Sequence, residues 1–181
     1  MKRIARNRSV LRPAMAFAAF GLMLGVGTPA LTQTVTAASL VDRAEVEDLL
    51  TRYYNNFGKA GGGQFGAFYT DDAEMVLGKM SYKGIAAIEG AYKGLANADI
   101  PQHKSFAFNI LMTNPLIVIH GSTATARLLF TEVVVDKQGD TPRLLTQGKE
   151  FDNLVKVKGQ WRISRRQILG AEQGPPADWK E

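Results

Sequence analysis

The sequence has no cysteine and only two histidines among its 181 residues. Without cysteine the chain can form no disulfide bond and offers no thiolate to a metal, so its fold depends on a hydrophobic core. His103 lies in a predicted polar loop and His120 in a His-Gly-Ser turn, where a solvated side chain is the expectation. Because no histidine is paired with a carboxylate at ligand spacing, we expect no metal site.

A phosphate-binding loop is missing too. The glycine run Gly61–Gly63 follows a predicted helix instead of opening one, so it is interpreted as a helix terminator.

The chain has no strong net charge when its N-terminal residues are left out of the count. The chain has 22 Lys and Arg against 17 Asp and Glu, but five basic residues and no acidic residue precede position 39. The remaining 17 of each sign argue against a nucleic-acid-binding surface.

Residues 1–38 have the pattern of a secretory signal peptide. Basic residues precede the apolar run Ala14–Val26, which is too short to favour a spanning helix of about 20 residues. Small residues allow cleavage near 30 or near 37–38, and the pattern does not choose between them. We expect an exported protein, periplasmic or extracellular, with no stable membrane anchor after cleavage. An uncleaved N-terminal anchor is the alternative.

The first half of the remaining chain has helical patterns around a short hairpin. Apolar residues recur at helical spacing over Leu40–Phe57, with Ser39 as the expected cap and Gly58 as the stop. A short helix, Gln64–Tyr69, is expected to end at Thr70-Asp71-Asp72. A hairpin over 73–82 turns at Gly78-Lys79, and a third helix covers Gly84–Leu95.

The second half reads as four long strands. These are Ser105–Ile119, Thr123–Val135, Arg143–Val157 and Gln160–Leu169, joined by short turns that imply consecutive antiparallel pairing. Pro115 must then lie at a sheet edge or a bulge. Helices followed by a curved antiparallel sheet predict one α+β domain over residues 39–169. The tail, 170–181, is expected to be mobile, with Trp179 able to dock.

This order of elements resembles the SnoaL-like branch of the nuclear transport factor 2-like superfamily. The matching stretches are Arg52–Tyr54, Phe68–Ala73, Lys83–Ile88, Met112–Ile117, Gly121–Ala126 and Gly148–Arg166. The resemblance implies a cone-shaped, strongly bent antiparallel sheet, wrapped by about three helices around an internal apolar pocket. It also implies a common homodimer, and small dehydratases, isomerases and cyclases that use no metal or organic cofactor. Many members of the family have no known activity.

The sequence departs from the dehydratases of this family at their acid/base positions. The pair Tyr-Asp that those enzymes carry at the end of the first helix is replaced by Phe57-Gly58. Their two sheet histidines fall near Asn109 and near Leu128, neither of which titrates near neutral pH. A histidine-based elimination is therefore not expected.

Glu150 and Asp152 are the remaining acid/base candidates. They are two residues apart on one predicted strand, so both side chains project from the same face. If that face lines a cavity, a carboxylate near apolar walls has a raised pKa and can act as a base. The alternative is an ion pair with Arg162, Arg165 or Arg166 on the neighbouring strand.

Further residues are candidates for lining the pocket, since aromatic and methionine side chains suit an apolar ligand. Tyr54 and Asn109 are candidates for orienting a substrate. The ligand-binding candidates are Tyr54, Phe57, Phe68, Met75, Met80, Phe108, Asn109, Leu128, Phe130 and Glu132.

Two functional hypotheses follow. The first is an exported protein that binds a small, largely apolar or polycyclic molecule and catalyses a cofactor-free isomerisation or dehydration with Glu150 as base. The second is a non-catalytic ligand carrier or dimeric interaction module of the same fold.

Overall fold

The computed structural model describes residues 35–57 and 64–180. The predicted signal core, the cleavage site near 30, Gly58 and Gly61–Gly63 lie outside these residues. No helix of the described part is long and apolar enough to cross a membrane.

Helix α1 spans Ala37–Tyr54, three residues earlier at each end than predicted. Its cap is Thr36, not Ser39: the Thr36 side chain accepts from the Ser39 N–H, and the Ser39 hydroxyl accepts in return from the Thr36 N–H. This reciprocal capping box satisfies two backbone donors that a helix start leaves free. The predicted apolar stripe is confirmed. The buried residues of the helix are Val46, Leu49, Leu50, Tyr53 and Tyr54.

The segment after α1 departs most from prediction. The expected helix Gln64–Tyr69 is a single 3₁₀ turn, η1 (Phe65–Phe68). Tyr69 already belongs to strand β1 (Tyr69–Leu77), where it pairs with Ile163, so Thr70-Asp71-Asp72 lies in a strand and does not end a helix. The prediction was wrong there because pairing with a distant strand overrides the local helical pattern.

The remaining elements follow the predicted order closely. Strand β2 (Met80–Lys83) forms a hairpin with β1, and helix α2 (Ile85–Ala96) follows. The predicted polar loop that contains His103 includes a short helix, α3 (Pro101–Lys104). Strands β3 (Ala107–His120), β4 (Thr123–Val135), β5 (Arg143–Val157) and β6 (Gln160–Gly170) complete the chain.

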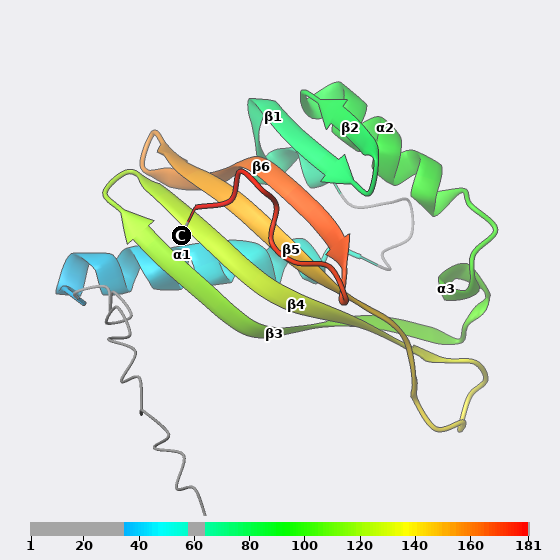
Figure 1. The fold of residues 1–181 in the computed structure, drawn as a ribbon. Helices are drawn as coiled ribbons and strands as arrows, with labels where there is room; N and C mark the ends of the chain where they lie inside the picture. The colour runs from blue at the N-terminus through cyan, green and yellow to red at the C-terminus, as the bar shows by residue number, and fades with distance from the viewer. Residues whose placement is uncertain (1–34, 58–63, 181) are drawn as a thin grey trace, which may run out of the picture. The chain divides into compact units, whose positions relative to one another are not determined.

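The six strands form one sheet in the order β2-β1-β6-β5-β4-β3 (Figure 1). The four long strands are consecutively antiparallel as predicted, but β1 runs parallel to β6, so the sheet is mixed. Pro115 lies on the edge strand β3 and within its bulge, beside Asn114 at φ 51°. Bulges bend a strand, and four of the five strand pairs have a register shift from a bulge or another irregularity, in keeping with the curvature of the sheet.

The core lies between one face of the sheet and α1, η1 and α2. Alternate residues of the long strands face it, including Leu128 on β4 and Leu154 on β5. Figure 1 shows α1 crossing the sheet along the side of β3, β4 and β5. The fold class, an α+β domain with three helices packed on a curved sheet, agrees with prediction.

The outer face of the sheet is contacted by the C-terminal tail. Trp179 packs edge-on against Phe151, with ring centroids 5.1 Å apart. Asp178 forms an ion pair with Arg165 at 3.3 Å, and the Lys149 ammonium donates to the Gln173 carbonyl at 2.6 Å. The docking of Trp179 is thus present, and the mobility of the tail stays a prediction.

Candidate functional site

Strand β5 brings two carboxylates to the core face. Glu150 is 1% exposed and Asp152 is fully buried, and the residue between them, Phe151, points to the outer face. The parity argument from the sequence is therefore correct. In the sheet register Glu150 lies between Leu128 and Ile168, and Asp152 lies between Ala126 and Arg166.

Arg166 is the cation of this face. It is fully buried and donates two parallel hydrogen bonds to Asp152, from Nε to Oδ1 at 2.8 Å and from Nη2 to Oδ2 at 2.7 Å. Its guanidinium also stacks on the ring of Tyr53, 3.8 Å from the centroid. Burial lowers the pKa of Arg166, but the negative charges of Asp152 and Glu150 raise it by more. The arginine pKa is therefore well above its usual range. A bidentate pair of this kind fixes the orientation of both groups.

Glu150 is held less completely. The Tyr54 hydroxyl donates to Oε2 at 2.7 Å. Oε1 lies 2.8 Å from Arg166 Nη2, but this contact lacks hydrogen-bond geometry, and Oε1 has no hydrogen-bond partner among the described residues. Nη1 of Arg166 has none there either. Removal from water raises the pKa of Glu150 well above its ordinary value, against the opposing effect of Arg166.

A set of tyrosines lies beside these charged groups. The Tyr53 and Tyr92 hydroxyls are hydrogen-bonded to each other, and Tyr92 is bonded in turn to Tyr69 at 3.1 Å. Burial raises the pKa of all three phenols, so they stay neutral at ordinary pH. Phe57 and Phe65 pack against the same rings.

Most of the predicted pocket residues lie on the core side. Tyr54, Met75 and Leu128 are buried. Phe57, Phe68 and Phe130 are partly buried and pack against the core. Phe130 covers Gly148, where an added Cβ would collide with the phenyl ring and approach the Leu169 carbonyl oxygen to 2.7 Å.

Of the other four candidates, Asn109 and Met80 are exposed, whereas Phe108 and Glu132 share the strand face of the core-packed Ile110 and Phe130. Asn109 is exposed, since it pairs with Val133 on the opposite face from Glu150 and so cannot orient a substrate beside it. Met80 is 54% exposed and contacts the Tyr82 hydroxyl. Phe108 is half-buried beside Val134. Glu132 is half-buried and accepts from Gln102 at 2.7 Å, with a pKa raised by desolvation.

The tyrosines beside Tyr54 were not predicted as site residues. Tyr53 sits in the apolar stripe of α1, which gives no sign that its ring supports an arginine. The sequence offers three arginines near Asp152 on the neighbouring strand, and the register shift between Asn153 and Leu154 brings Arg166 opposite it. A bulge shifts the alternation by one residue and leaves no clear mark in the sequence.

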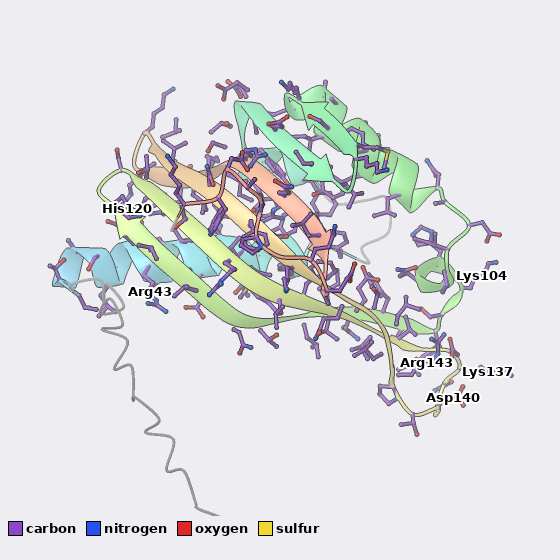
Figure 2. All side chains as sticks on the ribbon, in the orientation of Figure 1. Arg43, Lys104, His120, Lys137, Asp140 and Arg143 are labelled. Carbon is purple, nitrogen blue, oxygen red and sulfur yellow. The ribbon has the colours of Figure 1, made fainter. Side chains whose placement is uncertain are left out.

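Neither histidine approaches these groups. His103 is exposed and its Nδ1 contacts the Ala98 carbonyl at 2.8 Å. His120 is exposed at the β3–β4 turn (Figure 2). Within residues 35–57 and 64–180, no three His, Asp or Glu side chains are grouped closely enough to hold a metal ion.

This architecture, helices packed on a curved, unclosed mixed sheet, is that of the nuclear transport factor 2-like folds. A model of the SnoaL-like domain matches residues 38–167, and the chain belongs to this family. No curated protein matches the sequence.

Solved structures with the same fold share little sequence. Aln2 from Streptomyces is 19% identical at a TM-score of 0.62, covering 76% of this chain and 94% of its own. A proposed scytalone dehydratase from Novosphingobium aromaticivorans is 18% identical at 0.59, covering 81% and 100%. An NTF2-like protein from the same species is 20% identical at 0.59, covering 76% and 86%. At such low sequence identities the similarity establishes the fold only, so function must be inferred from the residues of the site.

Proposed function

We propose that this protein is an exported SnoaL-like protein that binds a small, largely apolar or polycyclic molecule and catalyses a cofactor-free proton transfer. The reaction is of the isomerase or dehydratase type, with Glu150 as the base. The observation that carries the proposal is a buried carboxylate, oriented by Tyr54, whose second oxygen has no hydrogen-bond partner among the described residues.

The surroundings of Glu150 suit this role. Burial raises the pKa of Glu150 well above its ordinary value, which makes its carboxylate a stronger base than a solvated one. Aromatic side chains around it, including Tyr54 and Phe57, favour an apolar ligand. The Tyr54 phenol, kept neutral by burial, can stabilise the carboxylate or a substrate oxygen by donating its proton in a hydrogen bond.

The reaction can be tested without knowledge of the natural substrate. 2-Tetralone is a bicyclic ketone with acidic C–H bonds beside its carbonyl. In D₂O a base removes one of these protons, the enolate forms, and deuterium returns to the same carbon. We expect the protein to accelerate this exchange, followed by NMR, and Glu150→Gln to lower the exchange rate by a factor of about 100 or more.

Glu74→Gln is the matched control. Glu74 also pairs with an arginine of β6, Arg165, but its side chain is 29% exposed and it lies on the β1 side of the sheet. Exchange should be unchanged in this variant. Equal loss in both variants, or no acceleration by the wild-type protein, contradicts the assignment of Glu150.

The second candidate is a non-catalytic ligand carrier. This candidate is favoured by the two positions at which the family's dehydratases have histidine. Here Leu128 is buried and Asn109 points away from the site. This function predicts saturable binding of 2-tetralone with no exchange above the solvent rate.

Export and a homodimer complete the proposal. Export rests on the signal-peptide pattern of the N-terminus. Native mass spectrometry of protein recovered from a bacterial periplasm would measure the N-terminus and the oligomer together. Retention of the full-length chain in the cytoplasm would contradict export, and a monomer would contradict the dimer.

A further inference from the structure

We propose that Nη1 of Arg166 and Oε1 of Glu150 together bind the hydroxyl group of an aromatic ligand. This inference rests on the proposed function and names its ligand class: phenols, and not apolar molecules in general. Four observations support it, namely the fixed arginine, the two unpartnered atoms, the charges around them and the rings beside them.

The guanidinium of Arg166 is held by Asp152 and by the ring of Tyr53. Asp152 takes Nε and Nη2 in a bidentate pair, and the Tyr53 ring lies 3.8 Å from the guanidinium carbon. Nη1 is the nitrogen that these contacts leave over, and it has no hydrogen-bond partner within the described residues. Because the residue is fully buried, bulk water does not satisfy this donor.

Glu150 leaves an acceptor in the same condition. Tyr54 occupies Oε2, while Oε1 has no hydrogen-bond partner in the part of the chain that the structure describes. The two groups are adjacent, since Oε1 lies 2.8 Å from Nη2 of the same guanidinium. A donor and an acceptor on these two adjacent groups match a hydroxyl, whose single oxygen accepts one hydrogen bond and donates another.

The charges select a neutral hydroxyl over charged groups. A ligand carboxylate would meet the carboxyl groups of Glu150 and Asp152, and an ammonium would meet Arg166. A phenol avoids both repulsions. It also donates a stronger hydrogen bond to a carboxylate than an aliphatic alcohol does, because its proton is more acidic.

The neighbouring side chains favour an aromatic ring next to that hydroxyl. Tyr54 and Phe57 stack with ring centroids 6.3 Å apart, and Phe57 and Phe68 are partly buried at the edge of the core. Offset and edge-on ring contacts favour an aromatic guest over an aliphatic one of similar area. Entry of the ligand requires these partly buried side chains to move, while the Asp152–Arg166 pair stays in place.

The test compares three probes of nearly equal size by isothermal titration calorimetry: 2-naphthol, 2-methoxynaphthalene and naphthalene. The methyl ether accepts a hydrogen bond but donates none, and naphthalene does neither. We expect 2-naphthol to bind at least about tenfold more tightly than either of the others, the factor set by one well-formed buried hydrogen bond. Glu150→Gln should reduce this preference to about threefold or less, and Glu74→Gln should leave it unchanged.

The outcomes separate this inference from the proposed function. Equal binding of all three probes overturns the phenol assignment while apolar ligand binding stands. No binding of any probe overturns both. A folded Glu150→Gln protein that keeps the full preference for 2-naphthol also overturns the assignment. If that variant does not fold, the wild-type affinities for the three probes decide the matter alone.

Discussion

Helix α1 contacts the β5–β6 hairpin near both of its ends. The contacts at its start are partly exposed to solvent, and those at its end are buried. At its start, Asp42 accepts hydrogen bonds from the Lys156 ammonium at 2.5 Å and from the Trp161 indole at 3.3 Å. The side chains of Asp42 and Lys156 are 18% and 27% exposed. At its end, Tyr54 donates to Glu150 and Tyr53 stacks on Arg166, and both charged groups are within 1% of full burial.

The carboxylate pKa shifts in opposite directions at the two ends, although each carboxylate has a cation beside it. Hydrogen bonding to Lys156 lowers the pKa of Asp42. Glu150 also has a cation beside it, yet desolvation dominates and raises its pKa. The pKa of Asp42 is therefore lowered at the partly exposed start of the helix, and the pKa of Glu150 is raised at its buried end.

The largest expected effect comes from removing the cation at each end. Arg166→Met leaves two buried carboxyl groups without their counter-charge and should cost about 3–5 kcal/mol of unfolding free energy. Lys156→Met, at the water-exposed end, should cost far less because solvent screens the remaining carboxylates. Urea denaturation of both variants measures the difference, and equal losses would remove the contrast between the two ends.

The next effect is a pH dependence that belongs to the buried end. The pKa of Glu150 is raised in the folded state, so between its ordinary value of 4.5 and the raised value the folded protein binds more protons than the unfolded chain. Stability from this group is complete below that range and is lost as pH rises through the folded-state pKa, with a slope of at most about 1.4 kcal/mol per pH unit.

Comparison with Glu150→Gln isolates this term, because the amide does not titrate. The unfolding free energy of the wild type relative to the variant should fall steadily as pH rises above 4.5, the ordinary glutamate value, toward the raised pKa of the folded state. A difference that is constant with pH would show that Glu150 titrates alike in the folded and unfolded chains.

The smallest expected effect is at the exposed start of α1. In protein that retains Thr36, Thr36→Ala removes the cap and should cost about 1 kcal/mol of stability. Ser39→Ala, which removes only the reciprocal bond, should cost less. Circular dichroism during urea unfolding measures both, and an unchanged midpoint for Thr36→Ala would mean that the ion pair of Asp42 suffices to hold this end.

Much of the fold could be predicted because its signals are local. Alternating side chains and short turns located the four long strands to within two residues, as for Arg143–Val157. The start of β1 was missed because its pairing with β6 joins positions far apart in the chain. The parity of Glu150 and Asp152 was predictable for the same local reason, whereas the choice of Arg166 depends on a bulge in the neighbouring pair of strands.

The burial of the site was the part that local signals could not supply. Tyr53 and Tyr54 are adjacent members of one helical stripe, yet the first supports a guanidinium and the second holds a carboxylate. Asn109 was placed in the site by likeness to enzymes with histidine there, but its face of β3 points outward. The likeness gives the position of Asn109 along β3 but not the face from which its side chain projects.

Gly148 limits how this sequence can diverge. Replacing Phe130 with a smaller side chain would remove one obstacle to a Cβ at position 148, but the Leu169 carbonyl, 2.7 Å away, belongs to the backbone of the next strand and would remain. A second substitution at Phe130 alone would therefore not relieve the contact of alanine at this position with the backbone. Descendants of this protein can exchange the aromatic side chains for a new ligand, but they are expected to inherit this glycine unchanged.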